Sequence, residues 1–157
     1  MRKVEARSLA KQFPFERVKL FYLVRSMEQV LRRPAERHAH KSAEQVALSD
    51  LDVLGREGLG GEPNSIPAID ALWKKLHIAG DWRKPDIRWI EPGGKGPLNR
   101  VSRASSELRD RHMVDVLLNS LKPGQRVLAM VGASHVVMQE PPLRKSLPTA
   151  RITKLRG

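Results

Sequence analysis

The stretch that decides the expected fold is residues 105–142, which read SSELRDRHMVDVLLNSLKPGQRVLAMVGASHVVMQEPP. Its first part repeats apolar residues at a helical period and predicts an amphipathic helix buried along one side. Lys122-Pro123-Gly124 ends that helix, because proline cannot continue the hydrogen-bond ladder and glycine tolerates a tight turn. Residues 127–131 are all apolar, and this short run after a Pro-Gly turn favours a strand covered on both faces.

A second strand is predicted at residues 86–91, before the glycine-rich loop at 92–97. Strand, loop, helix and strand form a right-handed βαβ unit with parallel strands, whose carboxyl ends lie at one edge. Because ligands of open α/β sheets bind beyond those ends, His135 and the glycine-rich loop are expected to share one site. The loop lacks the spacing of a phosphate-binding loop, so it is interpreted as a mobile connection with Lys95 as an anion contact.

The first half of the chain is predicted to be mainly helical. Apolar spacing indicates helices at residues 15–31, 41–54 and 68–78, with an irregular loop at 55–67. The expected architecture is therefore a single α/β domain over residues 1–157, with helices packed on a small parallel or mixed sheet. Residues 1–85 supply helices and residues 86–157 supply the strand-helix-strand region.

The residues around this unit carry a family resemblance. Arg109-Asp110 followed by Met113 resembles an RDxxM motif, and Gly132-Ala133-Ser134-His135 resembles a G-x-x-H motif at the end of a strand. In this order, and with the tail at residues 136–141, they resemble the C-terminal half of the TraB/Tiki/erythromycin-esterase/ChaN-like superfamily. The resemblance covers about a quarter of the chain closely.

This resemblance implies an α/β domain related to metal-dependent proteases and hydrolases, which pair two G-x-x-H motifs at one edge. The present sequence has one such motif and begins with a helical region, as the later portion of a longer family member would. The resemblance therefore implies an incomplete half of that fold, inactive alone and hydrolytic in a full-length context. The alternative is a basic nucleic-acid-binding or noncatalytic interaction domain.

His135 is the central candidate residue, as a metal ligand or a general base. A neutral imidazole titrates near neutral pH, and either ring nitrogen can be oriented by a neighbour. One histidine does not hold a metal, since a catalytic zinc usually takes about three protein ligands. The divalent metal expected as cofactor therefore rests on the resemblance. A structural role for His135 stays an open alternative.

Arg109 is the second candidate catalytic residue, because it lies on the apolar side of its predicted helix, where a guanidinium needs a partner. That partner is either an anionic substrate or a structural group such as a strand-end carbonyl or Asp110. Ser134 and Glu140 are lesser candidates for substrate binding. A direct Ser134–His135 dyad is not expected, because neighbours in a strand point to opposite faces.

Composition bounds the partners and the location. The chain has no cysteine, no apolar run long enough to cross a bilayer and no signal peptide, which predicts a cytoplasmic protein without membrane insertion. The net charge of +12 indicates nonspecific anion or nucleic-acid binding, whereas 4% aromatic residues disfavour a platform that stacks bases. The helix at 15–31 is apolar on more than one side, which favours an ordinary core helix with two neighbours; the alternative is homo-oligomerisation through this helix, which would cover an exposed face.

Overall fold

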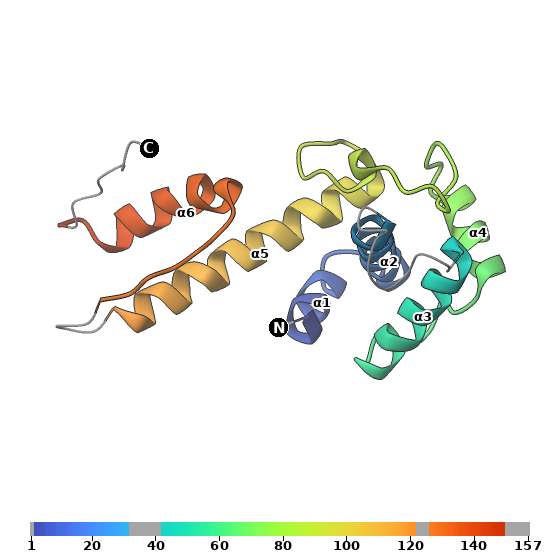
Figure 1. The fold of residues 1–157 in the computed structure, drawn as a ribbon, viewed down its shortest axis with the longest axis horizontal. Helices are drawn as coiled ribbons and strands as arrows, with labels where there is room; N and C mark the ends of the chain where they lie inside the picture. Colours follow the sequence, from blue (N-terminus) through green and yellow to red (C-terminus); the bar gives the residue numbers. More distant parts are fainter. Residues whose placement is uncertain (1, 32–41, 122–125, 150–157) are drawn as a thin grey trace. The chain divides into compact units, whose positions relative to one another are not determined.

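The computed structural model describes residues 2–31, 42–121 and 126–149, and in these ranges the regular elements are all helical (Figure 1). The chain divides into two compact units, Met1–Ser106 and Glu107–Gly157. The α-helices and the single 3-10 turn η1 are α1 (Arg2–Ala10), α2 (Phe15–Leu31), α3 (Ala43–Arg56), α4 (Ile66–Lys75), η1 (Ile87–Trp89), α5 (Pro97–Ser120) and α6 (Ala133–Ser146).

The predicted α/β class is wrong, because the described residues contain no strand. Within residues 86–91 the structure has the 3-10 turn η1 (Ile87–Trp89), and the side chain of its N-cap residue Asp86 accepts a hydrogen bond from the Arg88 backbone N–H at 2.9 Å. Trp89 packs edge-on against Trp73 of α4, with ring centroids 4.7 Å apart. Residues 127–131 are irregular and exposed. A strand exists only where a neighbouring strand accepts and donates backbone hydrogen bonds, and neither segment has such a neighbour among the described residues.

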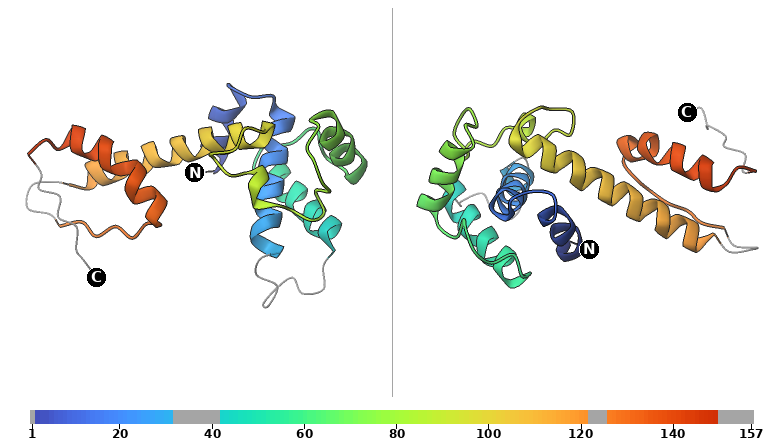
Figure 2. Two further views of the ribbon diagram at one scale, coloured as in Figure 1. Left: turned by 90° about the horizontal axis from the view of Figure 1, so that it is seen from above. Right: turned by 180° about the vertical axis from the view of Figure 1, so that it is seen from behind.

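Helix α2 is the centre of the first unit. It contacts α1 and α3, and α3 contacts α4 (Figure 2). Its buried apolar side chains are Val18, Leu20, Phe21, Tyr22, Leu23, Val24 and Met27. The helix predicted to be apolar on several sides is thus surrounded within its own chain, and these side chains are not available to a second copy.

Two serines mark where helices of the first unit begin. Ser42 caps α3 in a capping box: its hydroxyl accepts the Gln45 backbone N–H at 3.2 Å, and the Gln45 side chain accepts the Ser42 N–H at 2.9 Å. Ser65 caps α4 by accepting the Ala68 N–H at 3.4 Å. These caps place the α3 and α4 boundaries within a few residues of the predicted helices.

Arg83 joins α3, α4 and the loop that follows α4. Its guanidinium donates two hydrogen bonds to Asp70, at 2.9 and 3.0 Å, and one to Glu44 at 2.7 Å. The same group lies 4.4 Å from the centroid of the Trp82 ring, whose indole N–H donates to Asp70 at 2.7 Å. The hydrogen bonds from Arg83 and then from Trp82 lower the pKa of Asp70 below its ordinary value.

Asp70→Asn is expected to destabilise the first unit by a pH-dependent amount. A carboxyl whose pKa is depressed by folding stabilises the fold above the ordinary value of about 3.9, and this contribution is lost as the pH falls through the lower folded value. Asp70 is 37% exposed, so the difference should be about 1 kcal/mol or less between about pH 5 and 7. Urea unfolding of both proteins over a pH series measures it. A difference that does not shrink in acid would contradict the ion pair.

The glycine-rich loop is held against α5. The Asn99 side-chain amide donates to the carbonyls of Arg88 at 2.7 Å and Glu91 at 2.8 Å, and its oxygen accepts the Gly96 N–H at 2.9 Å. Arg103 donates to the carbonyls of residues 92 and 94, at 2.9 and 3.1 Å. Three of these hydrogen bonds tie residues of the loop itself to α5, and the other two hold the residues just before it. They give a structural role to the loop that is interpreted from the sequence as a mobile connection.

The second unit contains the end of α5, the segment 126–132 and α6. The segment runs back from the C-terminal end of α5 to the start of α6 (Figure 1). In the part of this unit that the structure describes, Val114 is the one buried apolar side chain, whereas Leu128 and Met130 are 88% and 91% exposed. The unit therefore has little apolar core of its own. No helix within the described ranges is long and apolar enough to cross a bilayer.

Candidate functional site

A histidine and a carboxylate meet in the second unit. The Nδ1 atom of His135, in the first turn of α6, lies 2.7 Å from Oδ1 of Asp110 on α5. The His135 side chain is 29% exposed and that of Asp110 is 10% exposed. Gln139, four residues after His135 and therefore on the same side of α6, donates to the same Asp110 oxygen at 3.3 Å and contacts the Met113 sulfur at 3.5 Å.

This geometry orients the imidazole. A carboxylate accepts hydrogen bonds, so Nδ1 of His135 carries the proton in the pair and Nε2 of the neutral ring keeps its lone pair. Gln139 donates a second hydrogen bond to the same Asp110 oxygen and so helps to hold the carboxylate in place. An imidazole whose Nε2 keeps its lone pair can accept a proton there or act as one ligand.

The structure places the other predicted residues differently. Gly132 is the N-cap of α6, so the prediction that His135 stands at the end of a strand is wrong. Arg109 is half-buried on α5, and the side chain that contacts the imidazole belongs to its neighbour Asp110. Glu140, which is expected to bind substrate, forms an ion pair with Arg144 at 2.7 Å. The Ser134 side chain lies outside the described residues.

The donor set around His135 does not fit a metal ion. Within the described ranges, no three side chains of His, Asp or Glu are grouped so that they could hold one. One imidazole with one carboxylate falls short of the about three protein ligands of a catalytic zinc. The expected divalent metal therefore stays a prediction of the resemblance, and no chemical step is assigned to it.

The basic residues that cluster along the sequence, at 2–3, 32–33, 100 and 103, 144–145, 154 and 156, lie only in part within the described residues. The side chains at residues 2–3, 32–33, 154 and 156 lie outside the description. Of the rest, Arg103 is bonded to loop carbonyls and Arg144 to Glu140. Arg100 and Lys145 are exposed, on separate units. Nonspecific anion or nucleic-acid binding by the charge of the chain stays a prediction.

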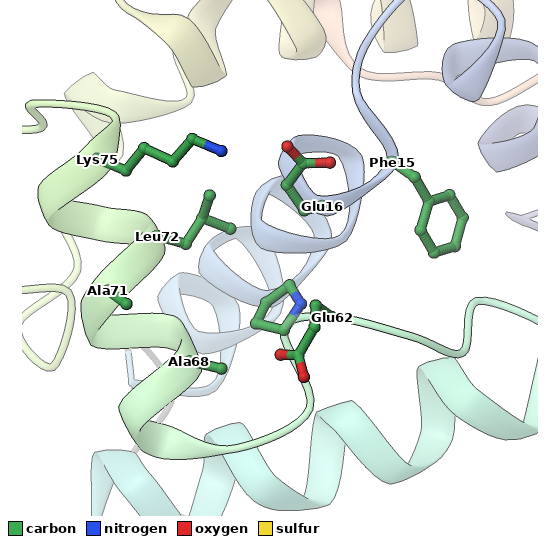
Figure 3. A pocket seen from close by; sticks show the side chains of 8 residues that line it. Phe15, Glu16, Glu62, Ala68, Ala71, Leu72 and Lys75 are labelled. Atoms are coloured by element: carbon green, nitrogen blue, oxygen red, sulfur yellow. The ribbon is translucent and has the colours of Figure 1, made fainter.

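Sequence reasoning missed a cavity of about 490 Å³ in the first unit. Figure 3 shows that its walls come from the start of α2, the loop before α4 and one side of α4. Two carboxylates, Glu16 and Glu62, and one ammonium, Lys75, stand among apolar residues. The lining comes from three separate segments and carries no motif, so no sequence pattern could have indicated it.

Lys19 of α2 is buried next to this loop, and its ammonium donates to the Gly61 carbonyl. Burial lowers the pKa of Lys19, and the charge of Glu62 opposes this effect. The hydrogen bond ties the 61–62 loop to α2. It gives Lys19 a structural role.

No family model, curated protein or solved structure matches this chain. The resemblance to the TraB/Tiki superfamily therefore rests on the residues that carry it. Two of them, Asp110 of the RDxxM stretch and His135 of the G-x-x-H stretch, are the two that meet.

Proposed function

We propose that this chain contributes an oriented general base, His135, to a hydrolase-like site. The observation that supports this proposal is the 2.7 Å contact between Nδ1 of His135 and Oδ1 of Asp110. The two residues lie 25 positions apart and belong to the two motifs of the resemblance. A cytoplasmic location, expected from the composition, belongs to the same proposal.

In general-base catalysis the His135–Asp110 pair has two tasks, which are to accept a proton and to stabilise the resulting positive charge. Asp110 holds the Nδ1 proton, which leaves Nε2 of His135 to take a proton from water or a hydroxyl as that group attacks a substrate carbonyl. Asp110 also stabilises the imidazolium that forms, since the carboxylate lies beside the new positive charge. Arg109 keeps its predicted role of stabilising negative charge in the substrate.

The tautomer of His135 tests this arrangement. In nitrogen-15 NMR spectra of the neutral ring, the Nδ1–H tautomer is expected for the wild-type chain, because Asp110 accepts that proton. Asp110→Ala should shift the ring toward the Nε2–H tautomer. His112 and His77, both exposed, provide internal controls that should not change. A His135 tautomer that is unaffected by Asp110→Ala would show that the carboxylate does not orient the ring.

A reactivity measurement separates a catalytic base from a structural histidine. Hydrolysis of an activated ester such as p-nitrophenyl acetate should be slowed by His135→Gln more than by the matched change His112→Gln on α5. Asp110→Asn should also slow it, because the amide no longer fixes one tautomer or stabilises the imidazolium. If the His135 and His112 variants retain equal rates, the pair is structural and the proposed function fails.

A further inference from the structure

The residues 127–131, VLAMV, form an extended exposed segment, called here the VLAMV segment. Leu128 and Met130 are the most exposed large apolar side chains of the described chain, at 88% and 91%. No backbone hydrogen bond joins this segment to another residue that the structure describes. Five consecutive apolar residues are thus exposed along a backbone that makes no hydrogen bond to the described residues, an arrangement that is costly unless another surface covers it.

Both faces of the segment are apolar. Side chains alternate along extended backbone, so Val127 and Val131 point to one face and Leu128 and Met130 to the other. A helical groove on a partner covers one face and offers few backbone partners. A bilayer covers apolar side chains but cannot satisfy N–H and C=O groups. A neighbouring strand within a covered sheet satisfies both requirements, because strand edges supply hydrogen bonds and packed layers cover the faces.

The charges around the segment indicate which kind of partner sheet it would bind. No Asp or Glu occurs between Asp115 and Glu140, whereas Lys122 and Arg126 precede the segment directly. A second copy would bring these cations against each other on a chain whose net charge is already +12. A foreign sheet edge with acidic side chains complements them. Charge therefore favours a different protein over a second copy.

We propose that the VLAMV segment is a docking strand that adds to the free edge of a β-sheet in another protein, at an edge flanked by acidic side chains. The exposed apolar residues that follow on α6, Val136, Val137 and Met138, continue this surface beyond Gly132. They would cover part of one face of the extended sheet. This proposal does not depend on the proposed role of His135.

The full chain and a labelled synthetic peptide test the proposal. The peptide alternates valine and threonine and carries glutamate at both ends, so that it is an isolated acidic strand. Fluorescence anisotropy is expected to show binding that weakens with salt and is weaker for a peptide with lysine at both ends. Carbon-13 labels in the VLAMV carbonyls should report strand formation by infrared spectroscopy. A version of the peptide with N-methylated amides on its pairing edge should not bind, since it cannot donate those hydrogen bonds.

Variants of the chain localise the binding. Ala129→Pro removes a backbone donor in the middle of the segment and should weaken binding by about tenfold or more. The control variant is Leu48→Asp, which changes an apolar side chain on α3 that is 47% exposed. A proline is not used at this position because it would break the helix. Leu48→Asp should leave the affinity unchanged. Circular dichroism checks that both variants keep the helix content of the parent.

Three results would overturn the proposal. The first is an absence of binding by the acidic peptide, and the second is binding that Ala129→Pro leaves intact. The third is a concentration-dependent dimer, seen by analytical ultracentrifugation and abolished by Ala129→Pro, which would assign the segment to a second copy of this chain. Each of these results is interpreted only for variants whose circular dichroism shows that the helices remain folded.

Discussion

Leu23→Ala is expected to lower the free energy of unfolding of the first unit by about 2–5 kcal/mol. Leu23 lies on α2 with none of its surface exposed, among the apolar side chains that α1 and α3 cover. The change removes buried apolar surface and leaves a cavity that neighbouring helices fill only in part. Urea denaturation followed by far-ultraviolet circular dichroism measures the loss, repeated over a range of protein concentrations.

The concentration series distinguishes a core helix from an interface. Because α2 is covered within the chain, the loss for Leu23→Ala should be the same in dilute and concentrated samples. Leu48→Ala, at a side chain that is 47% exposed on α3, is the matched control and should change stability by about 0.5 kcal/mol or less. Destabilisation that depends on protein concentration would show that residues 15–31 are buried by a second copy, the alternative that their sequence leaves open.

Helices α2, α3 and α4 of the first unit could be predicted because their signals are local. Apolar residues at the helical period indicated helices at 15–31, 41–54 and 68–78, and the structure has α2, α3 and α4 there. Ser42 and Ser65, which cap two of these helices, are residues of the types that favour that position. Such signals depend on neighbours within one or two turns, so they can be recognised without knowing the rest of the fold.

The predicted sheet is absent from the described residues, and its absence could not be read from local sequence because a strand depends on a partner strand. The VLAMV segment has the composition of a buried strand, and composition alone led to the predicted βαβ unit. Among the described residues no second strand exists to pair with it, so the segment stays extended and exposed. The residues after the segment form α6, which continues through Pro141 and Pro142. Proline disfavours the interior of a helix, so helix propensity alone would end α6 before these two residues.

The candidate site was predicted in part. His135 was singled out by its motif, and it is the imidazole that the structure orients. Arg109 is the second candidate catalytic residue of the sequence, whereas the contact with the imidazole is made by the adjacent Asp110. A one-residue step along a helix turns the side chain by about 100°. Which of two neighbouring side chains faces α6 therefore depends on the packing of the unit, and the motif does not contain that information.

Gly94→Ala is expected to destabilise the first unit by about 2–4 kcal/mol, although Gly94 is in a loop without positive φ. A Cβ atom at this position would stand 2.5 Å from Cγ of Asn99, too close for any contact between carbons. The Asn99 amide would have to move away from Arg88, Glu91 and Gly96, and its three hydrogen bonds are worth about 1 kcal/mol each.

Gly93→Ala is the matched control for this loop, since a Cβ there meets no atom within 4 Å. The two variants have the same composition and differ in position by one residue, so any general effect of alanine on the loop is common to both. Thermal and urea unfolding should show Gly93→Ala within about 0.5 kcal/mol of the parent and Gly94→Ala well below it. Equal stability of the two variants would mean that Asn99 does not hold the loop, and the glycine-rich stretch would regain its interpretation as a mobile connection.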